Sequence, residues 1–291
     1  MSKGVTGVCC VDNFAVKEWY LWSCQSFSGA ANMQLDHFLA RQVGKLVDRP
    51  VLRFFTWHPY CISLGFHQNL SDINQELCSA NALHVVRRPT GGRAILHAEE
   101  LTYSVVYPFD NLDVADFYRL VHLPFVTALQ AWQIPAEFQP SQADFRSVYK
   151  TDQAFLCFAT SAQFEVEIQG KKLIGSAQRV YQKAILQHGS ILLGPAHEEL
   201  VNYLNISPQQ KTKMQQYIQE HTTCLWKYDP KISAESLALQ LQDHFKKYFN
   251  LKFIPITDNK ALFKVLHDQA RESEFAIAEQ PQNRASVSGV H

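Results

Sequence analysis

The segment Arg87-Arg-Pro-Thr-Gly-Gly-Arg-Ala-Ile-Leu-His97 joins two apolar runs of the chain. The runs on either side, 83–88 and 94–97, have the composition of short strands, and the glycine pair between them is typical of a turn. Adjacent glycines let the backbone approach a ligand closely, with successive N–H groups facing it. The turn matches neither the P-loop nor the dinucleotide-binding pattern. A tight hairpin with solvated arginines is the alternative that these residues alone leave open.

Outward from this turn, strand-like segments come in consecutive groups with helical segments between the groups. This order predicts an α+β fold of mixed β-sheets flanked by helices and argues against an alternating parallel array. Pro124 should kink or break the second helix, and Ser233 is a plausible N-cap for the third. The expected strands are 51–57, 61–66, 101–107, 164–168, 172–174, 184–186 and 190–193, and the expected helices are 28–46, 113–132 and one starting after 233.

The composition divides the 291 residues into three parts. Residues 1–205 hold the strand groups and are predicted to form the core domain. From about 206 to 268 the pattern becomes helical, with apolar residues four apart, which predicts helices packed on that core. The polar residues 269–291 are expected to form a flexible tail.

Charge and cysteine usage exclude several classes of protein. The 27 basic and 27 acidic residues balance, so a protein that coats nucleic acid is not expected. No apolar run approaches the ~20 residues that span a bilayer. The odd number of cysteines, seven, and the absence of a secretory leader or a zinc-type spacing indicate reduced thiols and no metal site, and predict a cytoplasmic protein.

A second segment, Gly170-Lys-Lys-Leu-Ile-Gly-Ser-Ala-Gln178, lies in a stretch without acidic residues. Lys172 follows a turn and could direct its ammonium into a cleft, although such lysines are more often solvated. Fifteen residues earlier, Cys157 lies in an apolar run, where an inert core thiol is the usual outcome. A lysine facing the sulfur would instead favour the nucleophilic thiolate.

Taken together, these segments resemble the lipoate/biotin protein ligase family. The similarity runs in order through most of the first 200 residues, and each motif has compatible spacing. The motifs are Ala31-Asn-Met-Gln-Leu-Asp36, Leu52-Arg-Phe-Phe-Thr-Trp57 with Ser63-Leu-Gly65 and Gln68, the segment 87–97 with Glu100-Leu-Thr-Tyr-Ser104, Lys172-Leu-Ile-Gly-Ser-Ala-Gln178, and Leu186-Gln-His-Gly-Ser190.

Within the family, the chain is most similar to the cysteine-dependent octanoyl-[acyl carrier protein]:protein N-octanoyltransferases. Gly-Gly-Arg and a cysteine shortly before the Lys-x-x-Gly-Ser-Ala-Gln segment distinguish this subgroup. The resemblance implies that Cys157 and Lys172 are catalytic. It implies that the substrate is bound by Arg88, Thr90, Gly91, Gly92, Arg93, His97, Gly175, Ser176, Ala177, Gln178, His188 and Gly189.

The resemblance also implies the partners of the reaction. The donor would be octanoyl-acyl carrier protein, whose phosphopantetheine carries the acyl group, so the enzyme itself would need no cofactor. The acceptor would be a lysine on a lipoyl domain of a 2-oxoacid dehydrogenase or on the glycine-cleavage H protein. Neither nucleic acid nor a membrane is an expected partner.

Two other functions remain open at this point. An ATP-dependent lipoate-protein ligase shares the glycine turn and the lysine but needs no cysteine nucleophile. A non-catalytic lipoyl-domain binding protein would have a degenerate site, although the intact Lys172, Cys157 and Gly91-Gly92 argue against it.

Overall fold

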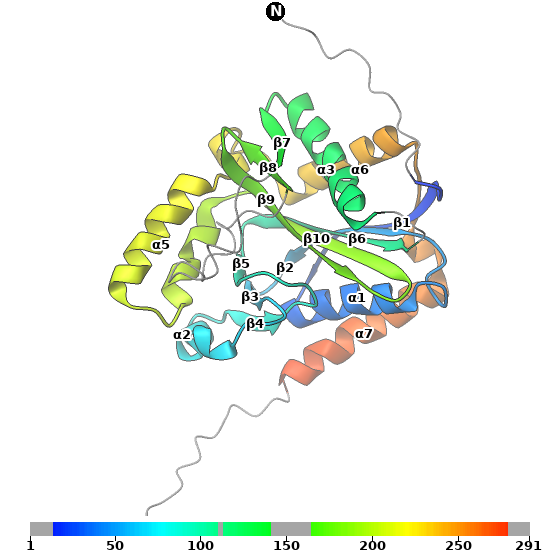
Figure 1. The fold of residues 1–291 in the computed structure, drawn as a ribbon. Helices are drawn as coiled ribbons and strands as arrows, with labels where there is room; N and C mark the ends of the chain where they lie inside the picture. Colours follow the sequence, from blue (N-terminus) through cyan, green and yellow to red (C-terminus); the bar gives the residue numbers. More distant parts are fainter. Residues whose placement is uncertain (1–13, 110–112, 141–163, 279–291) are drawn as a thin grey trace, which may run out of the picture.

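The computed structural model describes residues 14–109, 113–140 and 164–278. Within these ranges a large mixed β-sheet of eight strands runs through the molecule, in the order β11-β1-β2-β6-β10-β9-β8-β7. Figure 1 shows this sheet crossing the fold between two groups of helices. Its strands are β1 (Glu18–Phe27), β2 (Val51–Trp57), β6 (Glu100–Pro108), β7 (Ala136–Pro140), β8 (Phe164–Ile168), β9 (Lys171–Val180), β10 (Ala184–Leu192) and β11 (Lys252–Pro255).

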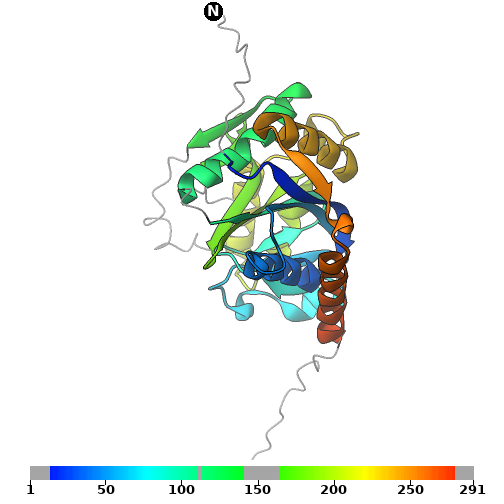
Figure 2. The same cartoon turned by 90° about the vertical axis from the view of Figure 1, so that its right-hand side faces the viewer.

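Helices cover both faces of the sheet. On one face α3 and α6 contribute Phe125 and Phe245 to the core, and on the other α1 and α7 contribute Leu39 and Leu266 to a second core. Figure 2 separates these layers, with the sheet seen between the two helix pairs. The helices are α1 (Gly29–Gln42), α2 (Gln75–Ala80), α3 (Val114–Ala131), α5 (Pro208–His221), α6 (Ala234–Phe249) and α7 (Lys260–Ala278), with short 3-10 turns at η1 (Leu70–Asp72), η3 (Pro195–Tyr203), η4 (Leu225–Lys227) and η5 (Ile256–Asp258).

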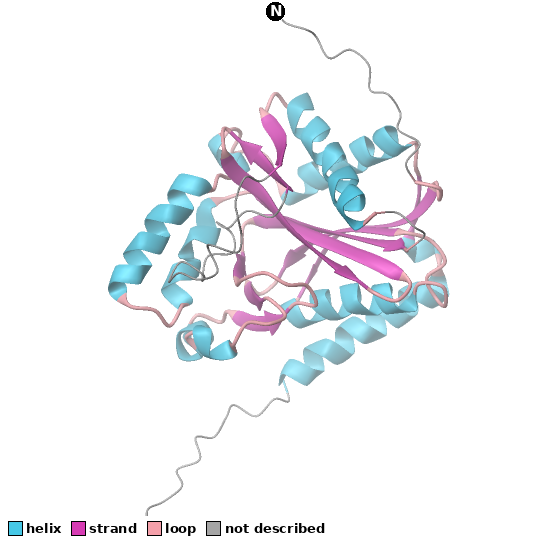
Figure 3. Cartoon of the chain, in the orientation of Figure 1, coloured by secondary structure: helices cyan, strands magenta, loops and turns pink. Residues whose placement is uncertain are grey.

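A small second sheet covers one end of the large one. Its strands are β4 (His84–Arg87), β3 (Cys61–Leu64) and β5 (Ile95–His97), in that order. The turn 88–94 connects β4 to β5 and contacts the main sheet through Thr90 and His188 of β10, and Figure 3 separates the loops of the fold from its helices and strands. The α+β architecture of mixed sheets flanked by helices is therefore confirmed.

Local signals account for several element boundaries. Ser28 accepts a hydrogen bond from the Ala31 N–H and starts α1, and Ser233 caps α6 as predicted. The helix α3 continues through Pro124 as one element, so the proline does not divide it.

The C-terminal part differs from the predicted division. Residues 206–268 contribute α6 and β11, and β11 pairs directly with β1 in the main sheet. Helix α7 reaches Ala278 and therefore covers the first ten residues of the stretch expected to be a flexible tail. Ala270 of α7 is buried in the core between α7 and the rest of the fold, which explains why the helix continues past residue 269.

Candidate active site

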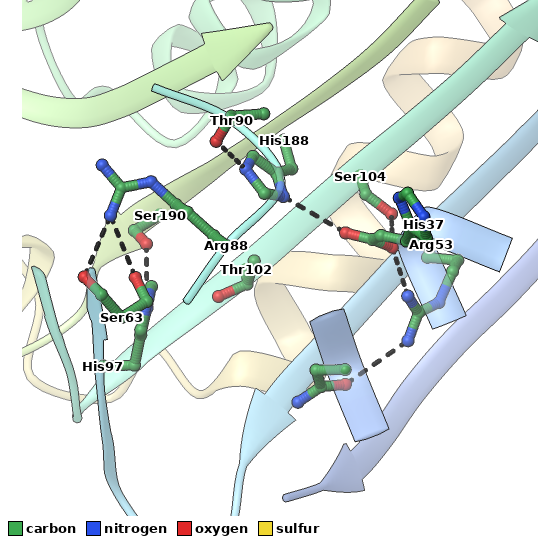
Figure 4. Close-up of polar contacts among 12 residues, drawn as sticks. His37, Arg53, Ser63, Arg88, Thr90, His97, Thr102, Ser104, His188 and Ser190 are labelled. Atoms are coloured by element: carbon green, nitrogen blue, oxygen red, sulfur yellow. Dashed lines mark hydrogen bonds and ion pairs between the residues drawn. The ribbon is translucent and has the colours of Figure 1, made fainter. Parts of the chain in front are cut away.

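A buried carboxylate, Asp36 of α1, organises one half of the site. Arg53 of β2 forms an ion pair with Asp36, and the Ser104 hydroxyl donates a hydrogen bond to the same carboxylate over 2.7 Å. His188 of β10 lies 3.2 Å from the other oxygen through its Nδ1 atom. Its Nε2 atom lies 2.7 Å from the hydroxyl of Thr90, in the glycine turn. Figure 4 shows this line of contacts from the turn to Arg53.

The electrostatics of this half fix its protonation. Burial alone would raise the pKa of the Asp36 carboxyl, but the Arg53 charge and the bonds from His188 and Ser104 outweigh it and hold that pKa below its ordinary value. Burial lowers the pKa of His188 despite the neighbouring carboxylate. A neutral His188 that donates from Nδ1 to Asp36 can accept at Nε2 from Thr90. Helix α1, which carries Asp36, therefore positions the glycine turn through the imidazole ring of His188.

The side chain of Arg88 holds the glycine turn from within. Its guanidinium donates to the carbonyl oxygens of Gly91 and Arg93 over 2.8 and 2.7 Å and to the Ser63 carbonyl over 3.0 Å. Arg88 is 4% exposed and also donates to the Ser63 hydroxyl over 3.1 Å, so it ties the turn to β3. The turn also requires glycine at position 92, where φ is +95°.

His97 and Glu100 organise the other half of the site. The Nδ1 atom of His97 lies 2.7 Å from Glu100 Oε1, and its Nε2 atom lies 2.7 Å from the Ser63 hydroxyl. The ring of His97 stacks on the indole of Trp57, with centroids 3.8 Å apart. Figure 4 shows His97, Ser63 and Arg88 in contact beside the Thr90–His188 pair, so both halves meet at the glycine turn.

A β-bulge turns Lys172 toward this face of the sheet. The pairing of β8 with β9 passes from Val166–Ile174 to Glu167–Lys172, so Leu173 is an extra residue. Ile174 belongs to the core on the α3 side. Because the register shifts by one residue, Lys172 lies on the opposite face, which it shares with His188. The residue is only 7% exposed, and its carbonyl accepts a hydrogen bond from the Thr223 N–H.

The structure brings together most of the predicted site residues. Thr90, His97, His188 and Lys172 share one face of the fold, where Ala177 and Gly175 pair with His188 and Ser190. The predicted nucleophile, Cys157, lies outside the described residues. The turn residues Gly91, Gly92 and Arg93 and the strand residue Gly189 belong to the same region.

Ser176 and Gln178 point to the other face of the sheet. The Ser176 hydroxyl lies 2.8 Å from the Tyr103 hydroxyl and 2.9 Å from His122 Nε2, beneath α3. The Gln178 amide donates to the Val114 carbonyl over 3.2 Å. In this structure both side chains bond within the protein, on the side away from His188.

Sequence reasoning did not assign a role to Asp36, Arg53, Ser63 or Glu100. Asp36 and Glu100 stood inside quoted motifs, but nothing in the spacing indicated that each would be a buried carboxylate with several donors. The signal that could have identified Arg53 is a charged residue in the middle of a strand of apolar residues, since such a charge is buried only when it is paired.

The described ranges contain neither a metal-binding cluster nor a membrane-spanning helix. No group of three or more His, Cys, Asp or Glu side chains could hold a metal ion in that part of the chain. Among the same residues no helix is both long and apolar enough to cross a bilayer.

The sequence of this chain is similar to a lipoyl ligase domain family and to octanoyltransferases. Residues 28–246 match the lipoyl protein ligase A/B catalytic domain. The octanoyltransferase LipM of Exiguobacterium sp. is 34% identical over 249 residues, which cover 83% of this chain and 90% of that protein. The octanoyltransferase LipM of Bacillus subtilis is 29% identical, with 90% and 96% covered.

Solved structures agree on the fold. A structure from the archaeal lipoylation system of Thermoplasma acidophilum, which comprises a bipartite lipoate protein ligase and its E2 lipoyl domain, superimposes with a TM-score of 0.69 at 20% identity, over 88% of this chain and 92% of that one. Lipoate-protein ligase A bound with ATP gives a TM-score of 0.66 at 19% identity, over 88% and 93%.

Proposed function

Because this chain belongs to the lipoyl protein ligase A/B catalytic domain family, we propose that it transfers an octanoyl group through a covalent thioester on Cys157. The chain is an octanoyltransferase of lipoate biosynthesis. The relatives that match it over most of both lengths are named octanoyltransferases. The acceptor is a lysine of a lipoyl domain. The donor in this proposal is octanoyl-acyl carrier protein, with no cofactor resident in the enzyme.

The reaction divides into two acyl transfers. The Cys157 thiolate attacks the donor thioester, the new C–S bond forms, and the phosphopantetheine thiolate leaves. This exchange of one thioester for another is nearly balanced in free energy and needs no ATP. The acceptor amine then attacks the enzyme thioester, so that the C–N bond of the amide replaces the C–S bond. Covalent catalysis lets two protein substrates use the same face in turn.

The placement of Lys172 is the observation that carries this proposal. The bulge at Leu173 directs this lysine to the face that holds Thr90 and His188, although regular alternation would bury it against α3. A buried ammonium on that face would favour a nearby thiolate or stabilise an oxyanion on the thioester carbonyl. Cys157 lies fifteen residues earlier in the sequence.

Two substitutions test the proposal against an ATP-dependent ligase. Changing Cys157→Ser should abolish transfer from the octanoyl carrier protein, whereas a ligase working through an acyl adenylate would keep its activity with free acid and ATP. Changing Lys172→Ala should slow transfer at least about 100-fold with the fold intact. Transfer by Cys157→Ser at the rate of the unsubstituted enzyme would exclude the thioester.

A further inference from the structure

A cavity of about 250 Å³ opens beside the His97–Glu100 pair. Apolar and aromatic residues form much of its wall, which also includes the acidic residues Glu99 and Glu100. Its lining includes Trp57, Tyr60, His97, Glu100, Leu193 and Ala234. Such a lining suits a ligand with an apolar stem and a cationic end.

The two oxygens of Glu100 have unequal environments. Oε1 lies within hydrogen-bond distance of three donors: the Thr102 hydroxyl at 2.6 Å, His97 Nδ1 at 2.7 Å and the Ser190 hydroxyl at 3.0 Å. Oε2 is buried and has no hydrogen-bond partner in the described part of the chain. The residue as a whole is 4% exposed. A buried carboxylate oxygen without a donor is costly, so its retention points to a ligand that supplies one.

The sheet register places this carboxylate at the end of the site where Lys172 lies. Glu100 pairs with Leu192 of β10, and Ile191 of β10 pairs with Ile174 of β9, two residues from Lys172. One strand therefore separates β6 from β9, which puts their backbones about 10 Å apart. Glu100 and Lys172 also project from the same face, because the bulge has shifted Lys172.

We propose that this cavity admits the side chain of the acceptor lysine and that Glu100 Oε2 binds its ammonium group and takes its first proton. This inference rests on the proposed octanoyl transfer and assigns a catalytic residue to its second step. The four methylenes of the lysine lie against Trp57 and Leu193, and the nitrogen meets the oxygen that has no partner.

The proton balance requires such a group. A lysine ammonium has an ordinary pKa near 10.4, so roughly one molecule in a few thousand is a free amine at pH 7. One proton passes from nitrogen to Glu100 Oε2 and then to solvent. The amine attacks the enzyme thioester, the C–N bond forms and the C–S bond breaks. The second proton leaves the nitrogen and is taken by the departing enzyme thiolate.

The test separates the two half-reactions in the full-length enzyme with a Glu100→Gln substitution. Acylation of the enzyme by octanoyl carrier protein should proceed within about twofold of the unsubstituted rate. Transfer to the lipoyl-domain lysine should slow at least about 100-fold, as expected when a general base is lost. Discharge of the acyl-enzyme by hydroxylamine, which is unprotonated at neutral pH, should keep its rate. The exposed residue Glu199 supplies the matched control, and Glu199→Gln should leave all three rates unchanged.

A second variant keeps Glu100 and fills the cavity. Ala234→Phe puts a larger side chain into the cavity wall and should slow transfer to the lipoyl domain while sparing hydroxylamine discharge. Transfer by Glu100→Gln at the unsubstituted rate would overturn the proposal. Equal slowing of all three reactions would also overturn it, because Glu100 would then only support the fold. Failure of the unsubstituted enzyme to form an acyl-enzyme would instead contradict the proposed function.

Discussion

At the scale of single residues, the site depends on buried polar groups that bring distant segments together. The resemblance predicted that Thr90, His97 and His188 would belong to one substrate-binding site, because all three lie in motifs of the family. It did not predict the ion pair of Asp36 with Arg53. That pair forms only because α1 packs across β2, and a single sequence contains no signal for which helix covers which strand.

His122 provides a residue-scale prediction about pH. Burial lowers its pKa to about 4, while its Nδ1 lies 2.7 Å from the Tyr118 carbonyl and its Nε2 lies 2.9 Å from Ser176 Oγ. An unfolded histidine binds its proton near pH 6.5. Between these two values the unfolded state holds more protons, so stability falls as pH decreases, by about 3 kcal/mol in total for this group.

Urea unfolding at several pH values between 7 and 4 measures this effect. The His122→Gln variant should lose stability less steeply with acid, by up to about 1.4 kcal/mol per pH unit. The difference between the two proteins isolates His122 from other buried histidines such as His188. Parallel curves for the two proteins would show that His122 does not change its charge on unfolding.

At the scale of elements, two departures from the predicted strands have local causes. A break was expected at His188-Gly189, but β10 passes through it without interruption. A side chain at position 189 would lie 2.3 Å from Ser176 Oγ, so the glycine permits close approach within the strand. The bulge at Leu173 was also not predicted, since a one-residue register shift depends on the partner strand.

The two glycines that meet the turn should respond differently to substitution. A Cβ atom on Gly65 would lie 1.8 Å from the Gly92 carbonyl oxygen, whereas one on Gly91 would have nothing within 4 Å. Gly65→Ala should therefore displace the turn and lower both the melting temperature and the transfer rate. Gly91→Ala should keep the melting temperature within the range of a neutral substitution but reduce transfer, because the open space at Gly91 is where the substrate is predicted to bind.

Thermal unfolding and the steady-state transfer rate test this pair together. An unchanged melting temperature for Gly65→Ala would contradict the close contact. Full activity of Gly91→Ala would remove that glycine from the predicted binding residues.

At the scale of the whole molecule, the zero net charge conceals an uneven distribution. The acid-free stretches 77–98 and 168–196 together contain seven lysine and arginine residues, and both lie at the site. The order of strand-like and helical segments predicted the fold class, but it did not predict that the C-terminal residues would complete the main sheet. Strand β11 pairs with β1, more than two hundred residues away, and so distant a pairing leaves no local pattern.

The C-terminal helices should therefore be part of the same cooperative unit as the core. Leu266 of α7 is fully buried, while Leu239 of α6 is 65% exposed. Leu266→Ala should cost about 2–5 kcal/mol of the free energy of unfolding. Leu239→Ala should change it by less than about 0.5 kcal/mol.

Denaturant unfolding monitored by both tryptophan fluorescence and circular dichroism checks this expectation. The two signals should change together in each variant, with a lower midpoint only for Leu266→Ala. A separate early transition in Leu266→Ala would mean that the C-terminal helices unfold independently of the sheet.

The intact mass of the enzyme shows whether a thioester forms on Cys157. The protein is mixed with octanoyl-acyl carrier protein in the absence of ATP, quenched in acid at short times, and weighed before and after a lipoyl domain is added. We predict one octanoyl group on Cys157, formed without ATP and lost to the lipoyl domain at least as fast as overall transfer. Transfer that proceeds without any such adduct, or only when ATP is present, would exclude the Cys157 thioester as the intermediate.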